Sequence, residues 1–198
     1  RLDDYSNHAW GRNQTFSTHW DYQFNDIWST AVTVGLNQRK YNSNTVTATA
    51  VNTTTGVVTR RPDAFRGFNH KTKYVSWDII GKPEIFGMTH SLVFGTDYEM
   101  NQTYRANAYN GVKNTDFTLS HPVYGLETVT DSSTEKTGDN NLLNRIHNRS
   151  IYFKDSIELT SQWIAVVGSR YQHYEQRESK GDASTLSYES SGDKFLPQ

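Results

Sequence analysis

The sequence predicts an all-β fold: an antiparallel up-and-down transmembrane β-barrel, of which these residues form about six to seven strands. Apolar and polar residues alternate with period two along several segments. Aromatic residues reach 13%, although hydrophobic residues make up only 34% and the mean hydropathy is −0.77. Short and long polar connections alternate along the chain. Disordered chains are also polar, but they are poor in aromatic and β-branched residues.

The first predicted hairpin covers residues 15–41. Asn25 and Asp26 predict a tight turn between its two strands. On each strand every second residue is apolar or Thr, and most of the residues between them are polar, which is typical of a strand with one face in an apolar environment. The apolar side carries Phe16, Thr18, Trp20, Tyr22 and Phe24 from the first strand, and Trp28, Thr30, Val32, Val34 and Leu36 from the second.

The same pattern predicts two more hairpins. One has strands at 74–79 and 90–101 around a turn near 86–88, and Pro83 predicts a bulge because it cannot donate to a strand ladder. The other has strands at 151–159 and 163–174. Asp155 interrupts its apolar side, and nothing in the sequence accounts for this. The apolar sides carry His90, Leu92, Phe94, Thr96, Tyr98 and Met100, then Ile151, Phe153, Ile157 and Leu159, then Trp163, Ala165, Val167, Ser169 and Tyr171.

The lengths of the connections predict an orientation in a membrane. Short turns fall near residues 25, 87 and 161, and long polar connections fall at about 42–63, 106–145 and 177–193, with a further polar stretch at 1–13. Outer-membrane barrels have short periplasmic turns and long extracellular loops. We therefore expect the long connections to lie outside the cell. Mid-strand residues of the apolar sides should face lipid: Val32, Val34, Leu92, Phe94 and Val167.

Aromatic residues predict the two edges of the lipid-facing band, because barrels carry aromatic girdles at both interfaces. One group lies close to the short turns and the other closer to the long connections. The alternative interpretation is the ordinary preference of strands for aromatic residues. The first group comprises Trp28, Trp77, Trp163, Tyr22 and Phe24, and the second comprises Tyr98, Tyr104, Tyr171 and Phe16.

Several function classes are excluded by composition. The net charge of −1 provides no excess of positive charge for binding nucleic acid. Cysteine is absent, and no nucleotide-binding, zinc-protease or nucleophile-elbow motif occurs, so we expect neither an enzyme nor a cofactor. His147 and His173 are better explained as polar strand positions than as metal ligands, and residues 131–139 lack the carboxylate spacing of a calcium loop. No run of 18 apolar residues predicts a transmembrane helix.

Two hairpins resemble a known family. Residues 151–160 followed by 163–171 resemble a recurring hairpin of TonB-dependent siderophore receptors, in which a YxQDxxxL strand precedes an LxxGxRYD strand. Lys154 replaces the usual Gln, and Gln172 the usual Asp. Residues 86–98 resemble a second family hairpin of the GxxHxLxxGxDY kind, and 195–198 resemble the start of a further strand. The resemblance runs in order over roughly residues 14–198 and is nearest to hydroxamate-type receptors, such as those for ferrichrome or coprogen.

The resemblance implies a barrel of roughly 22 strands with a plugged lumen. Residues 1–198 would form part of its barrel domain, without the plug domain, the TonB box and the C-terminal strands, and we interpret the sequence as an excerpt of a longer protein. The implied function is uptake of a ferric siderophore across the bacterial outer membrane, energised through TonB. Iron would be carried by the siderophore rather than by the protein, and the other partners would be TonB, through the absent N-terminal region, and outer-membrane lipid or lipopolysaccharide.

Two alternatives remain open. One is a soluble or surface-anchored β-sandwich that binds a ligand such as a glycan. The other keeps the barrel but changes the cargo to haem, cobalamin or a sugar.

Six residues are candidates for contacting the ligand, because a bulky chelate can be held by aromatic walls and a few donors without touching the metal. The alternation predicts that three of them face the lumen near the outer rim: Tyr41, Arg105 and Tyr174. Three others are expected in the loops above: Trp10, Tyr109 and Tyr124. Tyr109 is the first choice, since the resemblance places an aromatic contact just past the strand that ends at 105.

Overall fold

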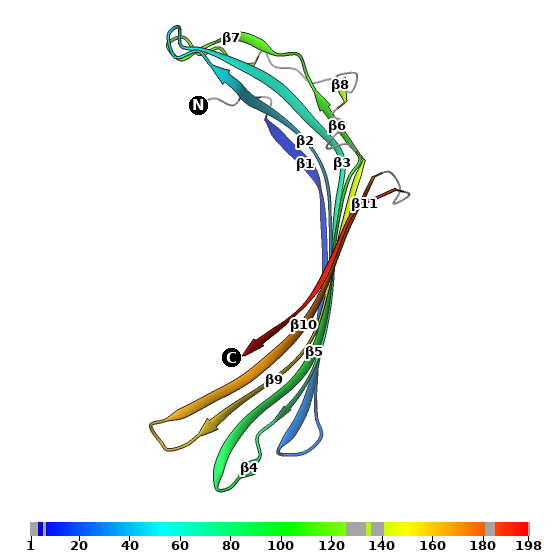
Figure 1. Cartoon of the computed structure of the whole chain (residues 1–198), viewed down its shortest axis with the longest axis vertical. Coiled ribbons are helices and arrows are strands. Elements are labelled where there is room, and N and C mark those ends of the chain that lie inside the picture. The colour runs from blue at the N-terminus through cyan, green and yellow to red at the C-terminus, as the bar shows by residue number, and fades with distance from the viewer. Residues whose placement is uncertain (1–3, 6, 126–133, 136–140, 181–184, 198) are drawn as a thin grey trace.

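A computed structural model shows the chain as one antiparallel β-sheet (Figure 1). It describes residues 4–5, 7–125, 134–135, 141–180 and 185–197. Within these residues no helix is long and apolar enough to cross a membrane. The strands are β1 (His8–Gln23), β2 (Trp28–Val51), β3 (Val57–Gly81), β4 (Glu84–Ile85), β5 (Met88–Arg105), β6 (Asn107–Asn110), β7 (Asn114–Thr118), β8 (Thr134–Glu135), β9 (Leu142–Glu158), β10 (Ile164–Lys180) and β11 (Thr185–Pro197).

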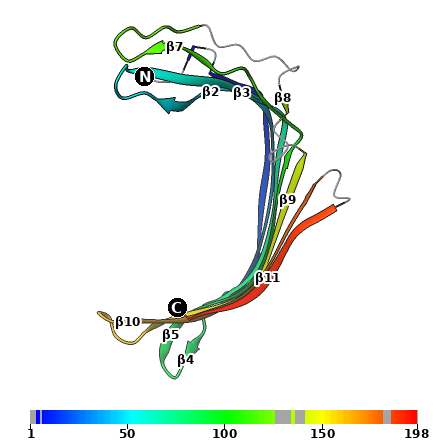
Figure 2. The ribbon, with the colours of Figure 1, turned by 45° about the horizontal axis from the view of Figure 1, so that its top comes forward.

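The long strands follow one another in the order β1-β2-β3-β5-β9-β10-β11, so each pairs with its neighbour along the chain. Four short strands are attached to this path, with β4 on β5, β6 and β7 on β3, and β8 on β6. The sheet is curved along its strands and bends to the same side at both ends (Figures 1 and 2). It is not closed, since β1 and β11 lie at opposite edges. This is the architecture predicted for a barrel segment, and a single sheet does not fit the β-sandwich alternative.

The register confirms the predicted alternation, because directly paired residues share a face of a sheet. One row of partners is largely apolar and the adjacent row is largely polar, so the sheet has an apolar face and a polar face. The apolar row is Trp20, Val32, Trp77, Thr96, Ile151, Tyr171 and Phe195. The polar row is Asp21, Ala31, Asp78, Gly95, Tyr152, Arg170 and Leu196.

Large side chains on the apolar face are not covered by the described residues. Trp20 is 57% exposed and Ile151 is 62% exposed. The rings of Phe94 and Phe153 lie on the same face, tilted against each other with centroids 4.8 Å apart. A soluble protein does not leave an apolar band of this size in water. A lipid environment for this face is therefore the consistent interpretation.

The three short turns have the expected residues. Asn25 Oδ1 accepts hydrogen bonds from the backbone N–H of Ile27 and of Trp28, both at 2.9 Å. Thr160 Oγ1 accepts a hydrogen bond from the backbone N–H of Trp163 at 3.1 Å. Phe86 and Gly87 both have positive φ, at 54° and 72°, as a two-residue hairpin loop of type I′ requires.

Pro83 marks a break rather than a bulge within one strand. Strand β3 ends at Gly81, and a short β4 follows the proline and pairs with β5. The Pro83 carbonyl accepts a hydrogen bond from the His90 N–H at 3.0 Å, which holds the break against β5.

Most of the expected long connections are extended strands, which corrects their predicted bounds. Strands β2 and β3 pair as far as Val51 and Val58, so the turn of the 42–63 segment is confined to 52–56. There Asn52 Oδ1 accepts from the N–H groups of Thr54 and Thr55, at 3.0 Å each. The 106–145 segment contains β6, β7 and β8, and the 177–193 segment is largely the ends of β10 and β11. Strand β1 likewise begins at His8, inside the stretch 1–13. Backbone pairing continues here because polar, Thr-rich strands remain hydrogen-bonded beyond the apolar band.

A small core stabilises the far end of the β2–β3 hairpin. The side chains of Arg60 and Phe117 are almost fully buried, with the guanidinium carbon 4.4 Å from the ring centroid. Arg60 also pairs with Asp4 at 3.4 Å and donates to the Val123 carbonyl at 2.8 Å. These contacts join the residues before β1 to the segment that follows β7.

The structure explains the positions of two residues on the apolar face, Asp155 and Trp77. Asp155 on β9 lies diagonally opposite His90 on the adjacent strand β5, on the same face. Its Oδ2 lies 2.7 Å from His90 Nδ1, and both residues are buried. This pair accounts for the acidic interruption of the apolar pattern. Trp77 lies four residues before the end of β3, opposite Val32 and Thr96, one apolar-face position further from the short turns than Tyr22 and Thr30. The break at Pro83 adds residues between Trp77 and its turn.

Candidate ligand-binding surface

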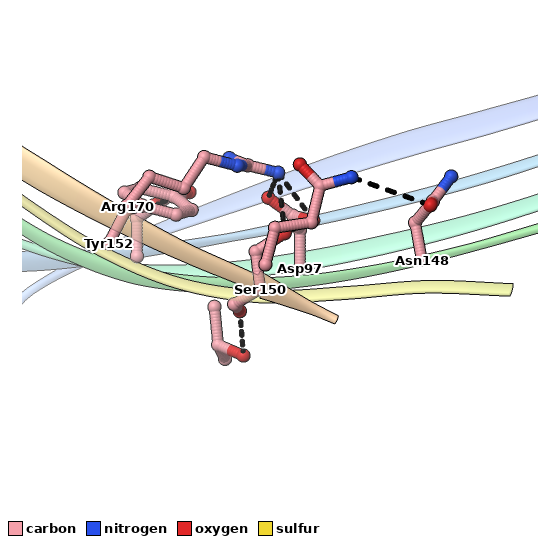
Figure 3. Close-up of polar contacts among 8 residues, drawn as sticks. Asp97, Asn148, Ser150, Tyr152 and Arg170 are labelled. Atoms are coloured by element: carbon pink, nitrogen blue, oxygen red, sulfur yellow. Dashed lines mark hydrogen bonds and ion pairs between the residues drawn. The ribbon is translucent and has the colours of Figure 1, made fainter. Parts of the chain in front are cut away.

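The polar face carries a hydrogen-bonded cluster across β5, β9 and β10 (Figure 3). Arg170 Nη2 lies 2.8 Å from Asp97 Oδ2, and Ser150 Oγ donates to Asp97 Oδ1 at 2.8 Å. The Arg170 guanidinium also lies over the Tyr152 ring, 5.3 Å from its centroid. Figure 3 shows Asp97, Ser150, Tyr152 and Arg170 on the same side of the sheet. The Asp97 carboxylate thus has a cation, Arg170, and a hydroxyl donor, Ser150, as partners. These bonds across three strands make this part of the sheet rigid.

Gly95 makes room for a second contact of this cluster. Tyr152 OH donates to Asp78 Oδ1, which is two strands away. A Cβ added at Gly95 would lie 2.3 Å from both Asp78 Oδ1 and Tyr152 Cζ. The tyrosine therefore crosses β5 at the one position without a side chain.

Nearer the long connections, the polar face carries an aromatic pair. The rings of Tyr41 and Phe68 lie 4.4 Å apart, and the Arg39 guanidinium is 5.2 Å from the Tyr41 centroid. The β2–β3 register shifts next to this pair, and Gly67 there has a φ of +65°. Its N–H donates to Asn42 Oδ1 at 2.8 Å. The shift is a β-bulge, a feature that redirects side chains next to binding sites.

A cleft of about 190 Å³ lies on the polar face around Arg105, between β5, β9 and β10. Its lining includes a cation, an anion and several neutral polar groups. Asn144 Oδ1 is buried and has no hydrogen-bond partner among the described residues, so it is available to a ligand or a water. The lining residues are Asn101, Thr103, Arg105, Leu142, Asn144, Ile146 and Glu178.

Neutral hydrogen-bonding groups dominate the rest of this region. Asn37 Nδ2 donates to Thr15 Oγ1 at 2.7 Å and to Asn13 Oδ1 at 3.0 Å. The His70 ring shares a hydrogen bond of 2.9 Å with Thr103 Oγ1. Such a surface can hold a bulky polar ligand through aromatic contact and multiple hydrogen bonds. The described residues contain no group of three or more His, Cys, Asp or Glu that could hold a metal ion.

Three of the six predicted ligand residues lie where the alternation placed them. Tyr41, Arg105 and Tyr174 have register partners on the polar face, at the end of the sheet that carries the long connections. Tyr174 lies against Gly192, where an added Cβ would come within 2.8 Å of its ring. These three residues come from three different strands, β2, β5 and β10.

Trp10 was expected in a loop, and this placement is wrong. It lies on β1 opposite Asn42, two residues into the strand, on the same face as Phe16 and Trp20. Its ring stacks on His8 at 4.6 Å, and the Arg66 guanidinium lies 5.1 Å from it. The strand continues past the apolar band, and the sequence shows no signal of where it ends.

Tyr109 and Tyr124 lie in the long connection but are packed there. Tyr109 is on β6, between β3 and β8, and is only 9% exposed, so the expected loop position is corrected to a buried strand position. Tyr124 follows β7, with its ring 5.3 Å from Tyr5 and 5.5 Å from Phe117. The structure does not bring either tyrosine to the Tyr41 pair.

Phe68 and Asn144 belong to this surface but were not among the predicted residues. Phe68 is the direct β3 partner of Tyr41 in the unbroken register that begins at Trp28 and Gly81, and the bulge at Gly67 follows this pair. Sequence alternation shows which face a residue takes, but it does not show which residue lies opposite. Gly67, which follows Arg66, was the one residue in the sequence that indicated a bulge beside Phe68.

A protein-family model described as "TonB dependent receptor-like, beta-barrel" matches residues 1–198. No protein of curated function matches the sequence significantly. Three solved structures with the same fold are the ferric citrate transporter FecA, the ferric preacinetobactin receptor BauA from Acinetobacter baumannii, and the closed form of the ferric-catecholate import receptor Fiu from E. coli K12.

FecA is 17% identical with a TM-score of 0.67, and this chain is covered to 97% and FecA to 25%. BauA is 16% identical with a TM-score of 0.69, and the alignment covers 99% of this chain and 28% of BauA. Fiu is 11% identical with a TM-score of 0.76, and the alignment covers 98% of this chain and 30% of Fiu. At these identities the likeness concerns the fold. The chain thus spans between a quarter and a third of each of these structures.

Proposed function

The chain belongs to the TonB dependent receptor-like β-barrel family, whose model matches all 198 residues, and from this premise we propose that it forms part of the wall of a receptor for a ferric siderophore in the bacterial outer membrane. The family consists of transport receptors rather than enzymes. In this assignment the apolar face contacts lipid, the polar face lines the lumen, and the long connections lie outside the cell.

The observation that carries the proposal is the chemistry of the polar face near the long connections. It combines an aromatic pair, Tyr41 and Phe68, with the cations Arg39 and Arg105 and with many neutral amides and hydroxyls. A ferric chelate encloses its metal and presents carbon-rich and oxygen-rich surfaces. Aromatic rings and hydrogen-bond donors can hold such a cargo without ligating the iron.

The class of chelate rests on the sequence resemblance. That resemblance is nearest to receptors for hydroxamate siderophores, of the ferrichrome or coprogen type. The three solved structures are named for citrate, preacinetobactin and catecholate complexes, so they support a ferric chelate in general. We therefore propose a ferric hydroxamate as the first ligand to test and the other chelates as its competitors.

The remaining partners follow from the same assignment. TonB would act through a region outside these residues, on the side of the short turns, and no cofactor is needed because the iron is part of the cargo. Opening of a plugged barrel requires energy from outside the protein, since the outer membrane has no nucleotide supply of its own.

The test uses the complete protein that contains this chain, with Tyr41→Ala, Phe68→Ala and Arg105→Gln introduced singly. Ligand binding is measured by fluorescence quenching with ferrichrome, and then with ferric citrate and a ferric catecholate. Removing a central aromatic contact typically costs about 1–3 kcal/mol, so we expect a loss of about 5- to 150-fold in affinity. Tyr171→Ala, an aromatic removal on the apolar face, is the matched control and should bind normally. Unchanged affinity in all three polar-face variants would contradict the proposed site.

Tyr109 and Tyr124 remain proposed ligand residues, and their double replacement by alanine should weaken chelate binding while the barrel still assembles. Because both side chains are packed in the long connection, the measurement needs a control for loop integrity. Protease sensitivity of the intact receptor supplies it. Weakened binding with unchanged protease resistance supports direct contact, whereas normal binding removes this pair from the site. Trp10 and Tyr174 stay in the proposed set for the same single-alanine test.

A further inference from the structure

The cleft around Arg105 is too small to hold a whole ferric chelate. Its volume is about 190 Å³, whereas pockets that enclose a drug-sized ligand occupy about 300–1,000 Å³. Its size therefore allows a side group of a larger cargo that is bound above it. The chemistry of the lining decides which side group fits.

Charges are ordered along the strands that form this cleft. The outermost row of the polar face is cationic, and the next row, two residues closer to the short turns, presents oxygen atoms and an aromatic ring. We call this second row the acceptor row. The outermost row is Arg105, Leu142 and Lys180. The acceptor row is Thr103, Asn144, Glu178 and Tyr188.

Glu178 is the one acid of the acceptor row, and no described residue neutralises it. None of the ion pairs among the described residues involves Glu178. The neighbouring Arg177 lies on the other face of the sheet, 2.8 Å from both Glu175 and Glu189. Glu178 is half-buried, so a ligand can reach its carboxylate. A cationic group can therefore bind there without breaking an existing ion pair.

Two neighbours in the acceptor row add contacts that suit an ammonium group. Asn144 Oδ1 is buried without a hydrogen-bond partner among the described residues, and leaving such an acceptor unsatisfied is costly. Tyr188 is the direct partner of Glu178 on β11 and so shares its face. An aromatic ring attracts a cation to its face. An ammonium group has three N–H donors, so it can satisfy the carboxylate and the amide oxygen together.

A β-bulge lies directly beside Glu178. The β10–β11 register shifts between Glu178 and Ser179, which leaves Ser187 without a direct partner. Bulges are over-represented next to functional sites, where they redirect a side chain. The irregularity therefore falls at the one acidic position of the cleft.

We propose that this cleft binds a protonated primary amine, carried on an alkyl chain of the ferric hydroxamate, with the ammonium group on Glu178 and Asn144. The alkyl chain lies against Leu142 and Ile146, and the oxygen-rich chelate stays above, next to Arg105. This arrangement follows the order of the charges along the strands. The inference rests on the proposed function and narrows it, because it names hydroxamates with a free amine as the preferred class.

The test compares two chelates of the same iron centre on the complete protein. The probes are ferrioxamine B, a linear ferric trihydroxamate that ends in a free amine, and its N-acetyl derivative, which lacks the positive charge. A hydrogen bond to a charged group corresponds to about 10- to 150-fold in affinity, so the parent protein should prefer the free amine by at least about tenfold. Glu178→Gln should abolish this preference by weakening only the binding of the free amine. The ratio of the two affinities is the readout, because a folding defect lowers both alike.

Glu175→Gln is the matched control, since it removes the same charge from the same strand but on the opposite face. It should keep the preference of the parent protein. Glu178→Asp retains the negative charge and should also keep the preference for the free amine. Equal affinity of the parent protein for the two chelates, or an unchanged preference in Glu178→Gln, would overturn the inference.

Ferrichrome, measured on the same samples, separates this inference from the proposed function. A parent protein that binds ferrichrome but shows no preference for the free amine overturns the inference and leaves the proposed function standing. A parent protein that binds none of the three chelates overturns both.

Discussion

Replacing Gly95 by alanine should destabilise the wall through one specific contact. The new Cβ would stand 2.3 Å from Tyr152 Cζ and from Asp78 Oδ1, far inside contact distance, so the tyrosine must move and release the Asp78 carboxylate. Overpacking of this kind costs about 1–3 kcal/mol. Losing a hydrogen bond to a charged group adds about 1.5–3 kcal/mol. Together these contributions should lower the free energy of unfolding by about 2.5–6 kcal/mol.

The assay is equilibrium urea unfolding of the complete protein in lipid vesicles, followed by tryptophan fluorescence. Gly35→Ala is the matched control, since its added Cβ meets nothing closer than Tyr74 Cβ at 3.7 Å, and it should change stability by less than about 0.5 kcal/mol. In a Tyr152→Ala background the space is free, and Gly95→Ala should then cost less than about 1 kcal/mol. The reasoning is refuted if Gly95→Ala is as mild as Gly35→Ala, or if its cost is unchanged when Tyr152 is absent.

Three further predictions concern the two faces and the orientation. Phe94→Lys should cost ~2–4 kcal/mol of unfolding free energy in lipid vesicles because it places a cation in the apolar band, and a cost near zero would contradict lipid contact. Asp155→Ala should cost about 1–3 kcal/mol in the same assay because it leaves His90 unpaired. Replacing both residues by leucine should be nearly neutral. Equal losses in the two variants would show that the loss of stability does not come from breaking the pair. An epitope inserted near Thr134 should bind antibody on intact cells and one at Asn25 should not, and the reverse pattern would invert the topology.

The sequence by itself determined the all-β class, the two faces of the sheet and the three short turns. These features are local. Side chains on a strand alternate with period two, so the face of each residue in 15–23 and 28–36 can be assigned without reference to any other strand. Asn25 and Gly87 likewise specify their turns through their own backbone and side-chain chemistry.

The tertiary structure decided where the strands end and which residues meet. Strand β1 begins at His8 and β2 continues to Val51, because hydrogen bonding between strands needs no apolar pattern. Trp10, which was predicted to lie in a loop, is therefore on a strand. Tyr109 is buried only because β6 pairs with β3 and β8, two segments that the local sequence around it does not specify.

The contacts of the polar face are the clearest case. Tyr152 and Asp78 are 74 residues apart, and Tyr41 meets Phe68 as its direct partner on β3, next to a bulge that shifts the register by one residue. Register depends on turns and bulges elsewhere in the sheet, and a shift of one residue changes every cross-strand partner beyond it. Alternation therefore assigns Tyr41, Arg105 and Tyr174 to the polar face, but the partners of each were decided by the pairing of the whole sheet.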